Sequence, residues 1–301
     1  MKIVSFLRSG ASVPHPGALL SDSDHIVDFL SEDAGIPAPA DALDWFDLDG
    51  PALAEAQALV DAVSSDTARR DAMQASGAIV ARSAVRLTAP VPRPRKVICI
   101  GLNYRDHAEE SGMDIPESPL IFSKFSTSVC GPGDTVRIPK GCENLDYEAE
   151  LGVVVGKRAS HVAVENGLDH VLGYVNLNDV SARDFQFADG QWQRGKSCDT
   201  FAPFGEFIAT KDEIADPHAL RIQLRLNGET MQDSSTDQLI FRIPELISSL
   251  SEAFTLEPGD VIATGTPPGV GFARKPPVWL RAGDVMEVEI EGLGVLTNPV
   301  G

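Results

Sequence analysis

Short apolar runs rich in Val, Ile and Leu recur beyond residue 95 and are separated by Gly and Pro. Runs of this length and composition predict β-strands, which we expect at residues 97–100, 151–155, 171–175, 222–226, 261–264 and 285–290. Helical periodicity is sparse in this part. The longest helical pattern covers residues 238–254, with Pro244 at a break or in a first turn. This balance predicts a β-rich roll or barrel with peripheral helices.

The first 88 residues follow a different pattern, in which short apolar segments alternate with acidic and Ala-rich ones. Residues 51–63 predict a helix, because Pro51 suits a first turn and Ala and Leu follow it. Prolines at 90, 92 and 94 favour an extended segment. We therefore expect a small N-terminal α/β domain at 1–88, a Pro-rich linker at 89–95, and a larger strand-rich α+β domain at 96–301.

The charge of the chain narrows the classes of function. Among 301 residues, 44 are acidic and 25 are basic, which gives a formal net charge of -19. Nucleic acids and anionic membranes attract basic surfaces, so this balance argues against both as partners. A small-molecule substrate remains the expected partner.

The lengths of the apolar runs and the spacing of the cysteines indicate the cellular compartment. The first apolar run, near Met1, is too short for the core of a signal peptide, and later runs are shorter than a membrane helix. Cys99, Cys130, Cys142 and Cys198 show no C-x-x-C spacing. Free thiols in a reducing cytoplasm are the expectation, and a zinc site is not.

Three carboxylates on two apolar stretches form the first candidate site. Glu148 and Glu150 are two residues apart in a predicted strand, so they project from one side, while Asp179 ends another predicted strand. Closely spaced like charges need a cation or a proton, and hard oxygen donors suit Mg²⁺. The alternative is the polar edge of a half-exposed strand, which shows the same alternation.

A second candidate pair lies on a short predicted helix that ends at Gly112. His107 and Glu110 are three residues apart, so on a helix they share a face. A carboxylate that binds one imidazole nitrogen fixes the tautomer and lets the other nitrogen take a proton from water. The segment predicts a lid over a site, and the alternative is a solvated acidic helix with an incidental histidine.

Two glycine-rich segments also suggest chemistry. Residues 190–197 match the phosphate-loop pattern G-x-x-x-x-G-K-[ST], but Pro203 and Gly205 stand where the required helix would run, so nucleotide binding is not expected. Lys196 can still present an ammonium to an anion. Residues 264–271 predict a rigid loop whose N–H groups could hold a carboxylate, or else a structural turn.

Several of these segments together resemble the fumarylacetoacetate hydrolase family, in its acylpyruvase and oxaloacetate decarboxylase-like members. The matching segments are Asn103-Tyr104 with His107 and Glu110, then residues 147–152, 178–184, 195–197, 258–267 and 291–298. They occur in the right order over residues 95–301. The resemblance implies a mixed β-roll, a homodimer and a divalent metal, usually Mg²⁺ and sometimes Mn²⁺ or Ca²⁺.

The resemblance also implies roles for individual residues. The metal ligands would be Glu148, Glu150 and Asp179, and the catalytic residues would be His107, Glu110 and Lys196. The substrate-binding residues would be Gln186, Thr266, Arg105 and Lys124, with Arg105 facing a distal carboxylate of the substrate.

The activity implied is hydrolysis of the C–C bond of a 2,4-dioxo acid to pyruvate and a carboxylic acid, with decarboxylation of oxaloacetate as a related reaction. Three alternatives remain open. They are isomerisation or decarboxylation of a 2-hydroxyhepta-2,4-diene-1,7-dioate, hydrolysis of a 2,4-dioxo-3-deoxy sugar acid, and a metal-stabilised binding or scaffold protein without activity.

Overall fold

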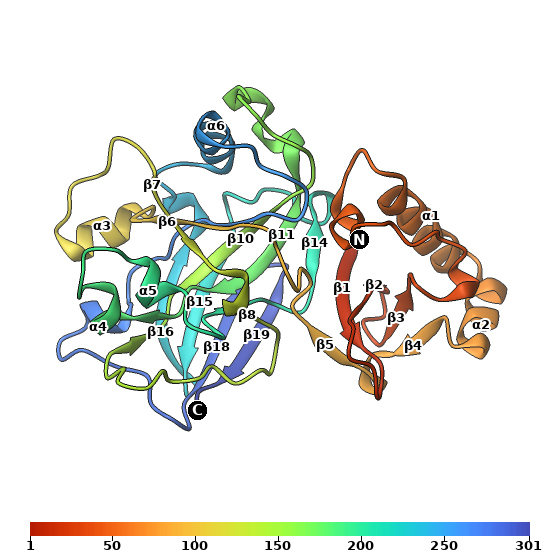
Figure 1. The fold of residues 1–301 in the computed structure, drawn as a ribbon, viewed down its shortest axis with the longest axis horizontal. Coiled ribbons are helices and arrows are strands. Elements are labelled where there is room, and N and C mark those ends of the chain that lie inside the picture. The colour runs from red at the N-terminus through yellow and green to blue at the C-terminus, as the bar shows by residue number, and fades with distance from the viewer.

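An 11-stranded sheet runs through the molecule in the computed structural model, which describes residues 1–301 apart from the side chain of Ser111. Its order is β4-β3-β2-β1-β14-β11-β10-β17-β6-β7, and β5 pairs with β1 (Figure 1). The strands are β1 Lys2–Leu7, β2 His15–Leu19, β3 His25–Asp28, β4 Ile79–Ala81, β5 Arg86–Thr88, β6 Val97–Gly101, β7 Leu120–Lys124, β10 Ala149–Val155, β11 Val171–Asn178, β14 Ile208–Thr210 and β17 Val261–Ala263.

A second sheet of four strands has the order β16-β15-β18-β19. Its members are β15 Arg221–Leu226, β16 Glu229–Ser235, β18 Val285–Ile290 and β19 Gly294–Pro299. Two small pairs complete the strands: β9 Leu145–Asp146 with β12 Ser181–Ala182, and β8 Val129–Cys130 with β13 Ala202–Pro203. In β15, Ile222, Leu224 and Leu226 are buried and alternate with polar residues, as a half-buried strand requires.

The helices are short and lie around the sheets. They are α1 Pro51–Ser65, α2 Thr67–Ser76, α3 Arg105–Ser111, α4 Arg183–Gln186, α5 Gln193–Lys196 and α6 Ile243–Ala253. Short 3₁₀ helices occur at η1 Glu32–Ala34, η2 Ala42–Phe46, η3 Arg82–Ala84, η4 Ser126–Ser128, η5 Val164–His170, η6 Lys211–Glu213, η7 Thr236–Gln238 and η8 Gly271–Ala273. Among the described residues, no helix has the length and apolar character needed to cross a membrane.

The expected strand-rich α+β architecture is confirmed, and each of the six predicted strands overlaps an observed one. The helix predicted at 51–63 is α1, with Pro51 in its first turn. The helix predicted at 238–254 is wrong in its first part, because α6 begins only at Ile243. Pro244 occupies the first turn of α6, where a missing N–H costs no hydrogen bond.

The apolar core consists of two clusters. One contains Ala149, Leu151 and Val153 of β10 together with residues of the four-stranded sheet and α6. The other contains Val154 of β10 together with buried residues of α1, such as Leu59. Alternate positions of β10 thus serve two cores, and every residue of β10 is buried.

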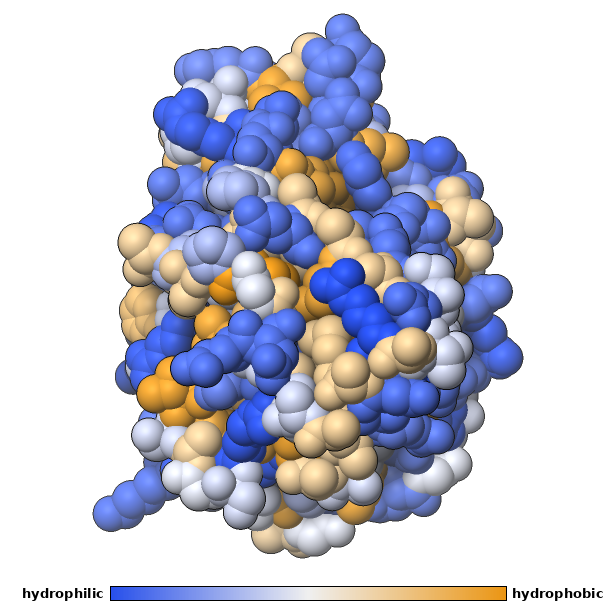
Figure 2. Space-filling model, turned by 90° about the vertical axis from the view of Figure 1, so that its right-hand side faces the viewer, coloured by the Kyte–Doolittle hydropathy of each residue, from blue (hydrophilic) through white to orange (hydrophobic). Residues whose placement is uncertain are grey.

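The first 88 residues form one side of the molecule, at the right in Figure 1. Strand β1 joins them to the rest, because Lys2 pairs with Ala209 and Ile3 with Ile208 of β14. Figure 2 looks onto this side and shows hydrophilic residues interspersed with hydrophobic ones. The sheet is therefore continuous across the predicted domain boundary, and whether residues 1–88 fold alone stays a prediction.

Candidate metal centre and active site

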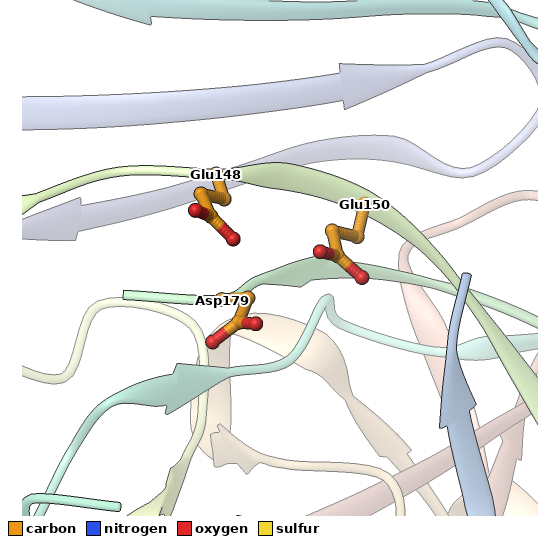
Figure 3. A group of neighbouring side chains, drawn as sticks. All are labelled: Glu148, Glu150 and Asp179. Carbon is orange, nitrogen blue, oxygen red and sulfur yellow. The ribbon is translucent and has the colours of Figure 1, made fainter. Parts of the chain in front are cut away.

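The carboxylates of Glu148, Glu150 and Asp179 lie close together where two paired strands meet (Figure 3). Glu150 lies in β10, Glu148 is the residue before this strand begins, and Asp179 is the residue after β11 ends. These strands are antiparallel with Ala149 opposite Asn178, so the start of one meets the end of the other. One oxygen from each carboxylate lies within 4.8 Å of the others. We call these three residues the carboxylate cluster.

The carboxylate cluster is buried, with exposed fractions of 7% for Glu148, 1% for Glu150 and 0% for Asp179. This burial excludes the alternative of a polar edge on a half-exposed strand. Buried carboxylates must be neutralised, and a set of hard oxygen donors suits Mg²⁺, Mn²⁺ or Ca²⁺. The residues present therefore fit a divalent cation, whose identity stays a prediction.

Three cationic side chains contact the carboxylate cluster. Lys196 Nζ donates to Glu148 Oε2 over 2.7 Å and to Asp179 Oδ2 over 2.9 Å. Lys124 Nζ donates to the other oxygen of Asp179. Arg183 Nη2 donates to Glu148 Oε1 over 2.5 Å. Both oxygens of Glu148 and both oxygens of Asp179 therefore accept charge-assisted hydrogen bonds.

The two glutamates of the cluster differ in their electrostatic environment. Burial opposes ionisation of Glu148, but the charges of Lys196 and Arg183 outweigh it and lower the pKa of Glu148 to about 2. Burial raises the pKa of Glu150 well above its ordinary value, and the charges of Asp179 and Glu148 raise it further. Glu150 is thus the carboxylate of the cluster whose charge the protein compensates least.

Lys196 and Gln186 come together because two short helices pack closely. A Cβ at Gly195 would lie 2.5 Å from the backbone nitrogen of Gln186, so only glycine allows α5 to approach α4. The single turn of α5 ends at Lys196, and no helix follows it in residues 197–205. The structural context of a phosphate loop is therefore absent there, and the Lys196 ammonium is bound to carboxylates.

Arg183 and Asp146 form a buried pair that the sequence analysis did not identify. Arg183 Nε donates to Asp146 Oδ2 over 2.8 Å, and Nη1 donates to Gln186 Oε1 over 3.0 Å. Asp146 also accepts from the N–H groups of Gly271 and Phe272, over 2.7 and 3.1 Å. Arg183 therefore holds Glu148, Asp146 and Gln186 in fixed relative positions.

The sequence did contain a signal for this pair. Asp146 continues the alternation of Glu148 and Glu150 by one step toward the N-terminus, which places a third acid on the same side of the chain. Arg183 lies four residues after Asp179 in a segment already linked to the family. A buried acid at position 146 needs a cation, and Arg183 is the one that the fold supplies.

The loop after β17 contacts the carboxylate cluster through its backbone. The N–H of Gly265 donates to Glu150 Oε2 over 2.9 Å. Thr266, which is buried, accepts from Gln232 Nε2 over 2.9 Å, and Gln232 Oε1 accepts from the N–H of Ala149 over 2.9 Å. Gln232 lies in β16, and no sequence pattern indicated its role. It joins the loop to the strand that carries Glu150.

Helix α3 holds the predicted lid pair. His107 Nδ1 lies 3.2 Å from Glu110 Oε2, so the two side chains share a face as expected. Glu110 also accepts from the N–H of Gly269, over 3.1 and 3.2 Å to its two oxygens. Because Gly265 of the same loop contacts Glu150, helix α3 rests on the loop that borders the carboxylate cluster, and its role as a lid stays a prediction.

The first turn of α3 is fastened to the protein at two further points. Arg105 Nη1 donates to the carbonyl oxygen of Leu239 over 2.7 Å, and the hydroxyl of Ser234 donates to Asp106. The structure thus gives Arg105 a backbone partner away from the carboxylate cluster. Its role toward a distal carboxylate of the substrate stays a prediction, as do the catalytic roles of His107 and Glu110.

Comparison with known proteins shows the family of this chain. Residues 96–301 match the fumarylacetoacetate (FAA) hydrolase C-terminal family. A mitochondrial oxaloacetate tautomerase of Xenopus laevis is 42% identical over 302 residues, which cover 100% of this chain and 90% of that protein. The family match covers the part that carries the carboxylate cluster, and the Xenopus match also extends across the first 88 residues.

Solved structures agree with the sequence matches. A fumarylacetoacetate hydrolase from Exiguobacterium antarcticum has a TM-score of 0.78 and 36% identity, and the match covers 100% of this chain and 99% of that one. A 5-carboxymethyl-2-hydroxymuconate delta-isomerase from Mycobacterium smegmatis has a TM-score of 0.74 and 31% identity, over 100% and 98% of the two chains. The chain therefore belongs to the fumarylacetoacetate hydrolase family.

Proposed function

We propose that this protein is a divalent-metal-dependent enzyme that interconverts the keto and enol forms of oxaloacetate, moving a proton between C3 and the oxygen on C2. The observation that carries the proposal is the buried carboxylate cluster with the Lys196 ammonium against two of its members. The full-length similarity to an oxaloacetate tautomerase supports this choice of substrate.

Charge on the C2 oxygen is the main obstacle to this reaction. Loss of a proton from C3 leaves negative charge on that oxygen, and fixed positive groups lower the barrier. A divalent cation held by the carboxylate cluster would act as a Lewis acid toward the oxygens of a 2-oxo acid. Lys196 adds an ammonium beside the same carboxylates, and Gln186 adds an amide group that Arg183 orients.

Two side chains are suited to handle the proton. Lys196 Nζ donates to Glu148 Oε2 and Asp179 Oδ2, so its ammonium lies at the carboxylates that would hold the cation and can give a proton there. In His107, Nδ1 faces Glu110 and leaves Nε2 as the atom that takes a proton. We propose Lys196 as the donor and His107 as the base.

A second candidate activity is hydrolytic cleavage of a 2,4-dioxo acid to pyruvate and a carboxylic acid. The specific observation in its favour is the His107–Glu110 pair, docked on the loop that borders the carboxylate cluster. In that reaction His107 would take a proton from the water that attacks the C4 carbonyl. Decarboxylation of oxaloacetate needs the same charge stabilisation without the water.

One assay series separates these activities. The protein with MgCl₂, and the same protein treated with EDTA, are given oxaloacetate, an acylpyruvate, fumarylpyruvate, a 2-hydroxyhepta-2,4-diene-1,7-dioate and a 2,4-dioxo-3-deoxy sugar acid. Loss of enol absorbance without pyruvate reports tautomerisation, and pyruvate release reports cleavage or decarboxylation. We expect Mg²⁺-dependent enol loss with oxaloacetate as the fastest reaction. Enol loss that EDTA leaves unchanged would contradict the metal-dependent mechanism.

We further propose that the protein acts as a homodimer. Leu120 and Ile121 in β7, at the end of the large sheet, and Phe125 after it are exposed apolar residues, and burial against a second copy would remove them from water. Light scattering after size-exclusion chromatography measures the mass directly, and a mass of one chain contradicts the proposal. A cytoplasmic location also stays a prediction, since the similar Xenopus protein is mitochondrial.

A further inference from the structure

The three candidate metal ligands differ in how many of their oxygens are already engaged. Glu148 and Asp179 each accept charge-assisted hydrogen bonds at both oxygens. Among the contacts of the described residues, Glu150 accepts at Oε2 only, from the backbone N–H of Gly265. Among the described contacts, no positively charged side chain binds Glu150, so a divalent cation would meet no competitor there. At Glu148 and Asp179 it would meet side chains that are already positively charged.

Of the three cations in the site, Lys196 is the one held only by the ligands themselves. Among the described residues, its Nζ donates to Glu148 and Asp179 and to no other acceptor. Arg183 also holds Asp146 and Gln186.

Lys124, the third cation, also has an acceptor outside the carboxylate cluster. Its Nζ donates to the carbonyl oxygen of Val180 over 3.0 Å. Arg183 and Lys124 therefore keep partners when the cluster binds a cation, whereas Lys196 does not.

An alternative position for the ammonium is already beside it. Lys196 Nζ lies 5.0 Å from the centre of the Phe122 ring, within the range of a cation–π interaction. Lys196 is only 2% exposed, so water screens little of the repulsion between its ammonium and a second cation. Two positive groups at the same oxygens thus disfavour each other strongly.

We infer that Lys196 and the divalent cation compete for Glu148 and Asp179, so that Lys196 weakens metal binding and metal binding releases the ammonium toward the substrate. This inference rests on the proposed function, because it takes the cation from there. Lys196 would thereby couple metal binding to proton donation. The ammonium becomes available as a proton donor when the ion that stabilises the C2 oxygen is in place.

The test is metal binding, measured by titration calorimetry with MgCl₂ and with MnCl₂. Lys196→Met removes the ammonium, and we expect about tenfold tighter binding of both ions, because a buried like charge no longer opposes the cation at the same oxygens. Lys96→Met is the matched control, because Lys96 Nζ also bridges two carboxylates, Glu257 at 3.1 Å and Asp260 at 2.7 Å. Its affinity for either ion should equal that of the wild type.

Thermal unfolding gives a second readout that needs no activity. Without metal, Lys196→Met leaves the carboxylate cluster with less positive charge and should melt below the wild type. With MgCl₂ its melting temperature should rise more than that of the wild type, since the ion then replaces the missing ammonium. Lys196→Gln, which is neutral but can still donate a hydrogen bond, should respond in the same direction.

The outcomes separate this inference from the proposed function. If the wild type binds Mg²⁺ and both Lys196 variants bind it equally or more weakly, the competition is overturned and the enzyme proposal stands. If the variants bind more tightly but the wild type turns over no 2-oxo acid, the competition holds and the proposed function is lost. If neither wild type nor variants bind either ion, both are overturned.

Discussion

Charged side chains lie mostly at the surface in the first 88 residues and are buried in numbers beyond residue 96. Among the described residues, Ser5 and Asp28 are the only buried polar side chains of the first region. The second region buries Lys124, Arg183 and Lys196 together with their acidic partners. Buried charge is costly unless paired, so its concentration marks the region that carries chemistry.

The two regions nevertheless share one sheet and both apolar clusters. Strand β1 pairs with β14. Within β1, Val4 belongs to one apolar cluster and Ile3 to the other, and both clusters continue into the second region. The first region thus contributes ordinary apolar packing to a structure whose other part carries the cost of buried charge. Four experiments test this difference between the two regions.

Removal of residues 1–88 should have the largest effect. It would leave the β14 edge without its partner β1 and expose buried residues such as Leu172, which belongs to the same apolar cluster as α1 and lines a pocket together with Leu53. We expect residues 89–301 to be insoluble or unfolded, because exposed strand edges and apolar surface favour aggregation. Circular dichroism and size-exclusion chromatography of the purified fragment check this. A folded, active fragment would show that the second region is independent.

Arg183→Met should destabilise the protein by about 3–5 kcal/mol, since it leaves the buried Asp146 and Glu148 without their shared cation. Arg70→Met in the first region is the matched control. It breaks the partly exposed pair with Asp22 and should cost less than about 1 kcal/mol. Urea unfolding of both variants measures the difference, and equal losses would contradict the contrast between the regions.

Glu150→Gln should separate function from stability. Loss of this ligand should lower the turnover of oxaloacetate about 100- to 1000-fold, because the negative charge that develops on the C2 oxygen loses several kcal/mol of stabilisation. Without metal the variant should be as stable as the wild type or more so, since burial and the charges of Asp179 and Glu148 disfavour the Glu150 carboxylate. Assays with MgCl₂ and unfolding in EDTA test the two halves separately. A large loss of stability in EDTA would contradict this view of Glu150.

Asp22→Asn should have the smallest effect, about 0.5 kcal/mol or less. Burial opposes ionisation, but the N–H of Asp24 and the side chains of His25 and Arg70 together outweigh it and lower the pKa of Asp22 from 3.8 to about 2. A lowered acid pKa stabilises the fold above pH 3.8, and this contribution disappears as the pH falls toward 2.

The gap in unfolding free energy between wild type and Asp22→Asn should therefore close between pH 4 and about 2. Asp24→Asn is the control, because no hydrogen bond of the Asp24 side chain is among the described contacts. A gap that stays constant with pH would mean that Asp22 contributes by packing rather than by charge.

The sequence determined a large part of the fold because local patterns determine local structure. Alternating and continuous apolar runs indicated β10 and β11, and Pro51 indicated the start of α1. The start of α6 was placed too early, since residues 238–242 have helical composition but lie in a 3₁₀ turn and a loop. Tertiary contacts, such as the hydrogen bonds of Asn103 with Phe241, decide the conformation there.

The candidate ligands were visible in the sequence because a strand places residues two apart on the same side. That rule and the resemblance to a family identified Glu148, Glu150 and Asp179. The sequence could not show that these carboxylates are buried, which depends on how the sheets and helices cover β10. Nor could it show which cation meets which oxygen.

Only the tertiary structure decided the electrostatics of the site. Lys196 lies 48 residues from Glu148 in the chain, and their contact depends on the close approach of α5 to α4 at Gly195. Contacts between residues far apart in the chain lower the pKa of Glu148, whereas burial and neighbouring carboxylates raise the pKa of Glu150. The two glutamates differ in this way although they lie in the same stretch of sequence. The sequence by itself determined which groups are available for chemistry; folding decided their charges, because electrostatic energy depends on distance and burial rather than on order along the chain.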